Sequence, residues 1–192
     1  MRPADNPFRA QRLAALRYRF TQATPSELIE RLAGLDHRAA LVGAHGSGKS
    51  MLMAALGSAL AEQGFALRQA RLHVGPGEPA RLAPGFLAEL TSRHFLLVDS
   101  AGVLGGWSLR KLLRASRRAG GLLVTLHQPG PLPTLLECHP GPELLAELIE
   151  ELAGAELAAR LPPAEELFAR HRGNLREALR GLYDWCGRGG GG

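Results

Sequence analysis

Two kinds of apolar spacing alternate along the chain, and together they predict a sheet whose strands are separated by helices. Short unbroken apolar runs are typical of buried parallel strands, whereas apolar residues spaced by three and four indicate amphipathic helices. Strands are predicted at residues 39–42, 65–72, 94–99, 122–125 and, shorter and set among prolines, 135–138. From Pro142 onward only helical spacing remains.

Helix signals lie between these strands and after the last of them. Thr24 is predicted as an N-cap, with Pro25 at the first helical position and Glu27 three residues after the cap. Helices are predicted at 25–34, from 51 to the Gln63-Gly64 stop, around 86–90, and at 108–119, 143–152, 163–170 and 174–185. This order favours an α/β fold with a helical segment at its end.

The segment after the first strand carries the most specific motif. Gly43 to Ser50 matches G-x-x-x-x-G-K-[ST], the P-loop or Walker A motif, and it lies between a strand and a helix as that motif requires. Glycines let successive backbone N–H groups face phosphate oxygens, and the helix N-terminus adds a positive dipole. The nucleotide-binding residues are therefore predicted to be Gly43, Ala44, His45, Gly46, Ser47, Gly48, Lys49, Ser50 and Met51.

A second landmark is the apolar run His94 to Val98, which ends in Asp99 as a Walker B strand does. Ligands of parallel sheets sit at the carboxyl ends of the strands, so Asp99 is expected near bound Mg²⁺. Ser50 would supply a hydroxyl to the same ion, and Lys49 would reach the β- and γ-phosphates. ATP and Mg²⁺ are the expected cofactors.

The composition of the chain limits the kinds of partner and site that it can have. The 192 residues carry a net charge of +5, which permits contact with nucleic acid, although the preference for arginine also fits a GC-rich coding bias. Lys49 and Lys111 are the two lysines among 23 basic residues. One of these two lysines therefore stands at the position where the P-loop motif requires one. The two cysteines suggest neither a disulfide framework nor a zinc site. The start has no signal-peptide pattern and no apolar run could span a bilayer, so a cytoplasmic protein without membrane contact is expected.

The predicted organisation is a three-layer α/β/α P-loop core with a parallel five-stranded sheet and a small all-helical lid. An arginine-rich lead-in is expected over 1–24, the core over 25–140, the lid over 141–187 and a flexible glycine-rich tail over 188–192.

The order of these motifs resembles the AAA+ branch of P-loop ATPases. His171 to Leu179 contains a Gly-Asn-x-Arg-x-Ala-Leu run, similar to the one that opens the last lid helix in clamp-loader-like and initiator-like members. The resemblance implies that Arg176 is sensor 2, which reaches the γ-phosphate, and that Thr125 is sensor 1. Independently of it, Asn174 can cap a helix.

Departures from the AAA+ pattern concern catalysis. Ser100 stands where those proteins usually have a glutamate that orients water. Thr125 or His127, which is similar to the switch histidine of ABC-type ATPases, could orient it instead. No arginine lies between Thr125 and Pro142, where the arginine finger is expected, and Arg117 and Arg118 are the nearest substitutes. Slow turnover is expected, since a finger contributes about 10³–10⁵-fold in related systems.

Three functions agree with these observations. The first is an AAA+-like ATPase with weak or partner-stimulated hydrolysis that drives a lid switch, with Lys49, Asp99, Thr125, His127 and Arg176 as its catalytic residues. The second is a nucleotide-gated adaptor that does not hydrolyse ATP and binds a protein or DNA partner. The third is a small P-loop kinase. A protein partner or a second copy of the chain fits the first two.

Overall fold

The computed structural model describes residues 2–20, 22–73, 75 and 80–188. Residues 189–192 of the predicted tail lie outside this range, as do residues 76–79, a stretch with two prolines between the second and third predicted strands. The chain divides into two compact units. One comprises Tyr18–Gly43 and Lys49–Cys138, and the other comprises the described residues within Met1–Arg17, Ala44–Gly48 and His139–Gly192. We call them the sheet unit and the helical unit.

The sheet unit is built on five parallel strands in the order β2-β3-β4-β1-β5. Each predicted strand is present, with boundaries close to those expected. The strands are β1 (Arg38–Val42), β2 (Ala66–Arg71), β3 (His94–Asp99), β4 (Gly121–Leu126) and β5 (Thr134–Glu137). The central strands β1, β3 and β4 are almost fully buried, which explains their continuous apolar sequence.

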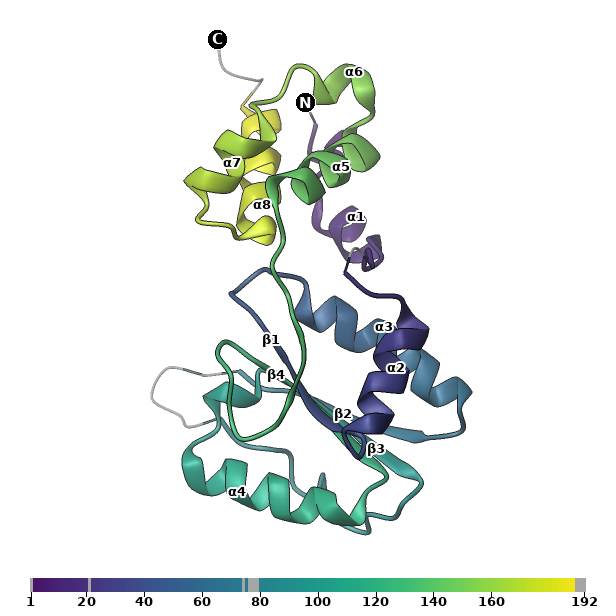
Figure 1. Ribbon diagram of the computed structural model, residues 1–192. Coiled ribbons are helices and arrows are strands. Elements are labelled where there is room, and N and C mark those ends of the chain that lie inside the picture. Colours follow the sequence, from purple (N-terminus) through teal and green to yellow (C-terminus); the bar gives the residue numbers. More distant parts are fainter. Residues whose placement is uncertain (1, 21, 74, 76–79, 189–192) are drawn as a thin grey trace. The chain divides into compact units, whose positions relative to one another are not determined.

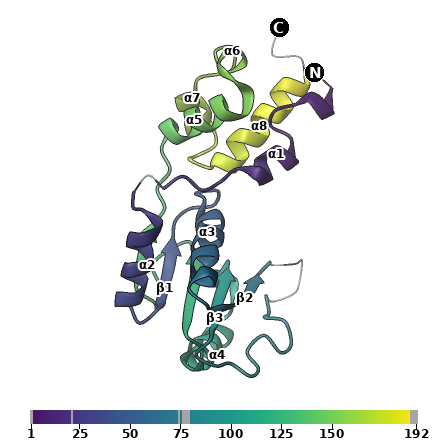
Figure 2. The same cartoon turned by 90° about the vertical axis from the view of Figure 1, so that its right-hand side faces the viewer.

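Helices cover both faces of this sheet, as Figures 1 and 2 show. Leu41, Leu97 and Leu123 face the helices α2 (Pro25–Gly34) and α3 (Lys49–Glu62). Their strand neighbours point the other way and pack with α4 (Gly106–Ala115) and the 3₁₀ turn Ala101–Val103. This alternation is the two-residue period of a strand, and it confirms the three-layer core.

Local signals explain where several elements begin. Thr24 and Glu27 form the predicted capping box at the start of α2: the Glu27 N–H donates to Thr24 Oγ1 at 3.3 Å, and the Thr24 N–H donates to Glu27 Oε2 at 2.8 Å. The helix expected around 86–90 is wrong, because that segment consists of turns. Gly85 and Glu89 there have φ angles of +80° and +50°, which a right-handed helix cannot contain.

The helical unit has its own core. Its helices are α5 (Pro142–Ala153), α6 (Ala155–Ala158), α7 (Ala164–Arg170) and α8 (Leu175–Gly187), joined by α1 (Ala10–Ala15) and a 3₁₀ turn at Pro3–Asp5. Phe8 is 1% exposed within this core, beside leucines of α5, α7 and α8. Asn174 caps α8 as predicted, since the Glu177 N–H donates to its Oδ1 at 3.1 Å.

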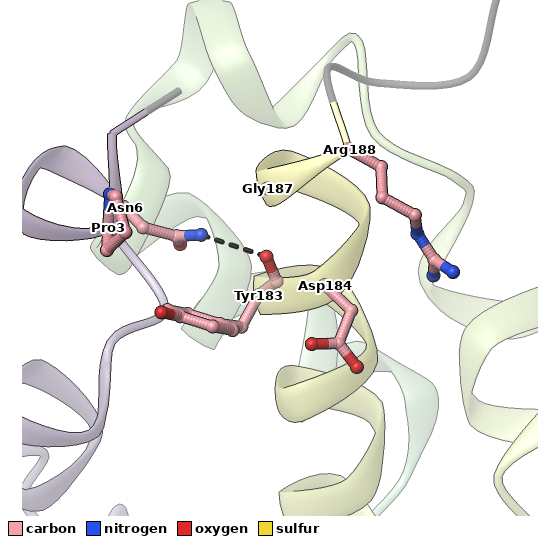
Figure 3. A pocket seen from close by; sticks show the side chains of 6 residues that line it. All are labelled: Pro3, Asn6, Tyr183, Asp184, Gly187 and Arg188. Atoms are coloured by element: carbon pink, nitrogen blue, oxygen red, sulfur yellow. Dashed lines mark hydrogen bonds between the residues drawn. The ribbon is translucent and has the colours of Figure 1, made fainter.

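The N-terminal segment packs along α8. Asn6 is 1% exposed, and its Nδ2 donates to the Tyr183 carbonyl oxygen at 2.9 Å (Figure 3). The residues around this contact line a shallow hollow: Pro3, Asn6, Tyr183, Asp184, Gly187 and Arg188. None of the predicted nucleotide-binding residues lines it.

Candidate functional site

The candidate site begins at the carboxyl end of β1, where the chain leaves the sheet and enters α3 through the predicted P-loop. Gly46 and Gly48 have φ angles of +74° and +88°, which only glycine adopts without strain. Lys49 opens α3, is 7% exposed, and its Nζ donates to the Gly43 carbonyl oxygen at 2.6 Å. Burial lowers the pKa of Lys49, although Cys138 and Asp99 act in the opposite direction.

Asp99 ends β3 and lies between the ends of two neighbouring strands. On the β4 side, Thr125 Oγ1 donates to Asp99 Oδ1 at 2.7 Å. On the β2 side, Arg71 Nε donates to Asp99 Oδ2 at 3.0 Å and forms an ion pair with it. Both carboxylate oxygens therefore have a partner before any ligand is considered.

The electrostatic state of Asp99 follows from these partners. Its burial by itself would raise the pKa, but hydrogen bonds from Thr125 and Ser50 and the ion pair with Arg71 lower it below the usual value. The carboxylate is thus ionised at neutral pH. The Ser50 hydroxyl joins the first residues of α3 to the end of β3, so both predicted metal ligands are brought together.

Thr125 has a structural task in this site. Its hydroxyl donates a hydrogen bond to Asp99 and accepts one from the Ser100 N–H, each at 2.7 Å. The residue is 1% exposed. A hydroxyl has one donor and two lone pairs, so one acceptor position remains. Thr125 therefore orients Asp99 and fixes the start of the following turn.

Ser100 adopts a left-handed conformation, with φ +62° and ψ +37°. Non-glycine residues reach this region at a cost of about 1–2 kcal/mol. The Thr125 contact and the 3₁₀ turn that follows hold the backbone there. No carboxylate follows Asp99 in this turn.

His127 lies one residue beyond β4 and approaches the start of the P-loop. Its Nδ1 is 3.4 Å from the Gly43 carbonyl oxygen, the same oxygen that Lys49 contacts. The sheet unit thus brings together six of the predicted residues: Gly43, Lys49, Ser50, Asp99, Thr125 and His127. Arg176 belongs to the helical unit, where it is exposed in the first turn of α8.

Sequence reasoning missed Arg71. It is the last residue of β2, and the sheet register places it opposite Asp99. Its side chain keeps 60% of its area exposed. The carboxyl ends of parallel strands meet at one edge of a sheet, so the last residue of the strand beside β3 is expected near Asp99. The sequence could have identified Arg71 only if the strand order had been known.

Chemically, this edge can hold a polyanion together with a divalent cation. The loop and the start of α3 offer backbone N–H groups, an ammonium group and the Ser50 hydroxyl, and β3 offers the ionised carboxylate of Asp99. These are hard oxygen ligands of the kind that Mg²⁺ prefers. Of the helices that the structure describes, none is long and apolar enough to cross a membrane.

Comparisons with known proteins extend this description. No protein-family model and no curated protein sequence matches the chain. Among solved structures, a point variant of RuvB from Thermotoga maritima aligns with a TM-score of 0.56 and 20% identity, covering 85% of this chain and 60% of RuvB. A structure of NtrX from Brucella abortus in complex with ATP aligns with a TM-score of 0.50 and 15% identity, covering 90% of this chain and 51% of NtrX.

These similarities show the fold alone: the chain folds like the RuvB and NtrX structures, and this fold is of the AAA+-like type that the sequence motifs predicted. It spans between half and two thirds of the length of the proteins it resembles.

Proposed function

We propose that this protein binds ATP with Mg²⁺ at the carboxyl edge of its sheet, and that it hydrolyses ATP slowly or with the help of a partner. The observation that carries this proposal is the convergence of Lys49, Ser50 and Asp99 from two elements that are far apart in the sequence. The ATP in the NtrX complex agrees with it. The residues Gly43 to Met51 would surround the phosphates, with Lys49 at the β- and γ-phosphates.

Ser50 and Asp99 are the residues that would hold the metal ion. The Asp99 carboxylate is ionised and oriented by Thr125, and the Ser50 hydroxyl already lies within hydrogen-bond reach of it. Bound Mg²⁺ would neutralise phosphate charge as it develops during transfer. Arg71 forms an ion pair with Asp99. Its guanidinium and Mg²⁺ would therefore compete for the same carboxylate.

Slow turnover is proposed because the groups that accelerate hydrolysis are incomplete. Ser100 supplies no carboxylate, and its hydrogen-bonded left-handed turn fixes the backbone at that point. The Thr125 hydroxyl is buried and already hydrogen-bonded to Asp99 and to the Ser100 N–H, which leaves it little access to a water molecule. His127, beside Gly43, is then the better candidate to orient a water molecule.

The C-terminal helices complete the proposal. Arg176, which the AAA+ resemblance aligns with sensor 2, would contact the γ-phosphate and couple the helical unit to the nucleotide. A non-hydrolysing, nucleotide-gated adaptor is the second candidate, and the absence of a carboxylate at Ser100 favours it.

The decisive experiment compares the intact protein with Lys49→Ala. ATP with Mg²⁺ should raise the melting temperature of the intact protein, because a ligand at 100 times its dissociation constant adds about 2.7 kcal/mol. Lys49→Ala should lose most of that shift. Lys111→Ala removes the other lysine, which lies exposed on α4, and should keep the shift.

Phosphate release in the same samples separates the candidates. A slow release that Lys49→Ala abolishes supports an ATPase, and binding without release supports the adaptor. Equal thermal shifts in the intact protein and Lys49→Ala would refute the P-loop as the site. Transfer of phosphate to an acceptor nucleotide would instead identify a kinase.

A further inference from the structure

The surface of the sheet unit carries a stripe of exposed cationic side chains with a tryptophan at one end. The stripe follows α4 and the 3₁₀ turn Ser116–Arg118 after it. Its members are exposed and spaced by three and four residues, so they lie on one face: Trp107, Arg110, Lys111, Arg114, Arg117 and Arg118. We call this surface the α4 stripe.

The opposite face of α4 belongs to the core. Leu112 is fully buried, and Leu109 and Leu113 pack against the same cluster below the sheet. Figure 1 shows α4 lying along one face of the sheet, with α3 on the other. Because its apolar face is already covered, this helix, which the structure describes in full, exposes no large apolar side chain other than Trp107 with which to enter a membrane.

The charge of the α4 stripe is not compensated locally. The sequence contains no acidic residue between Asp99 and Glu137. The ion pairs found within the described residues involve none of the stripe's cationic side chains. Arg38 adds a further guanidinium at the end of the stripe, where it donates to Ser116 Oγ at 2.9 Å and has Arg117 for a neighbour, with Asp36 as the nearby acid.

Trp107 is unusual on such a surface. It is 77% exposed, and in the described part of the chain it is the one large apolar side chain that is exposed. Lys111 Nζ lies 5.9 Å from the centre of its ring. An indole face beside a row of cations fits a ligand that combines flat rings with regularly spaced anions.

We propose that the α4 stripe binds single-stranded nucleic acid, with an unpaired base stacked on Trp107 and the phosphates along Arg110, Lys111 and Arg114. Cationic grooves that follow a backbone, together with aromatic side chains that stack on bases, are the general means of binding single strands. Duplex DNA hides its base faces, so stacking on Trp107 selects the single strand. None of the residues of this surface belongs to the proposed nucleotide site, and the inference does not depend on ATP binding.

The test uses the fluorescence of Trp107. Trp185→Phe leaves Trp107 as the single tryptophan, and titration with a 25-nucleotide oligo-dT should quench its emission to saturation. Trp107→Leu keeps an apolar side chain but removes the ring, and should weaken binding of a labelled oligo-dT at least about fivefold. Duplex DNA of equal length should bind more weakly, and inorganic polyphosphate should not reproduce the quenching.

A second pair of variants tests the cationic residues of the α4 stripe. The triple change Arg110→Gln, Lys111→Gln and Arg114→Gln should weaken oligo-dT binding at least about tenfold. It should also reduce the slope of log affinity against log salt by about 2, since each contact contributes roughly 0.7 for single strands. The control, with Arg12→Gln, Arg31→Gln and Arg160→Gln, removes the same charge from exposed positions outside the stripe.

Three results would overturn the proposal: no quenching of Trp107, equal weakening in both triple variants, or tighter binding of duplex than of single strand. Lys49→Ala should bind oligo-dT like the intact protein, and the α4 triple variant should keep its thermal shift with ATP. A failure at one site is therefore distinguishable from a failure at the other.

Discussion

Asp99 is the residue on which the proposed chemistry of the sheet edge depends. Three elements send a side chain to it: Thr125 from β4, Arg71 from β2 and Ser50 from α3. Two of these contacts orient the carboxylate for a cation, whereas Arg71 is itself a cation. Arg71 is thus one of three residues that lower the pKa of Asp99, after Thr125 and Ser50, and it is the one that would compete with a metal ion for the carboxylate.

This competition gives a prediction for Arg71→Gln. The extra stabilisation that Mg²⁺ adds to the protein with ATP, measured as thermal shift with Mg²⁺ minus thermal shift with EDTA, should increase. The Arg71 side chain is 60% exposed, so the gain should be at most about 1 kcal/mol, the range of exposed ion pairs. Arg93→Gln, an exposed change of the same charge before β3, should leave the increment unchanged.

Asp99→Asn in the same measurement should remove most of the Mg²⁺ increment, because the substitution removes the carboxylate that would bind the ion directly. An unchanged or smaller increment in Arg71→Gln would mean that the guanidinium does not compete with the metal.

At the scale of elements, several features of both units could be predicted because their signals are local. The P-loop, the strand that ends in Asp99 and the caps at Thr24 and Asn174 each occupy a few consecutive residues, and their backbone groups are satisfied nearby. Arg71 could not be predicted in this way, because its role depends on β2 lying next to β3. The same holds for the turns at 84–89, where Arg68 of β2 donates to the carbonyl oxygens of Phe86 and Ala88.

Helix α8 carries the prediction that belongs to this scale. Arg176 is exposed in its first turn, whereas Arg180 in the next turn forms an ion pair with Glu177 at 3.3 Å. If Arg176 contacts the γ-phosphate, Arg176→Ala should lower ATP affinity about ten- to a hundredfold and leave ADP affinity nearly unchanged, as expected for a charge-assisted contact. Titration calorimetry with both nucleotides measures this ratio.

Arg180→Ala is the matched control, and it should change both affinities by less than about threefold, because an exposed ion pair contributes little. Equal losses of ATP and ADP affinity in Arg176→Ala would exclude a sensor 2 role and leave α8 as a packing element.

At the scale of the whole molecule, the two units differ in which segments of the chain form them. The sheet unit is formed largely by one continuous stretch, from Tyr18 to Cys138 with the P-loop residues 44–48 as its exception. The helical unit joins the two ends of the chain, because Phe8 enters a core made by α5, α7 and α8. The periodicity of residues 1–20 does not identify that partner, since a lone phenylalanine before a short helix fits many surfaces.

The last prediction tests whether the N-terminal segment stabilises the helical unit. Phe8→Ala removes a side chain that is 1% exposed, and such truncations cost about 3–5 kcal/mol. Native-state hydrogen exchange should therefore accelerate in α5, α7 and α8, while β1, β3 and β4 keep their protection. Phe95→Ala, at a fully buried position of the sheet unit, should give the reverse pattern. If Phe8→Ala instead accelerated exchange equally in both units, they would unfold as one cooperative body, and nucleotide bound at the sheet edge would then stabilise α8 without any contact from Arg176.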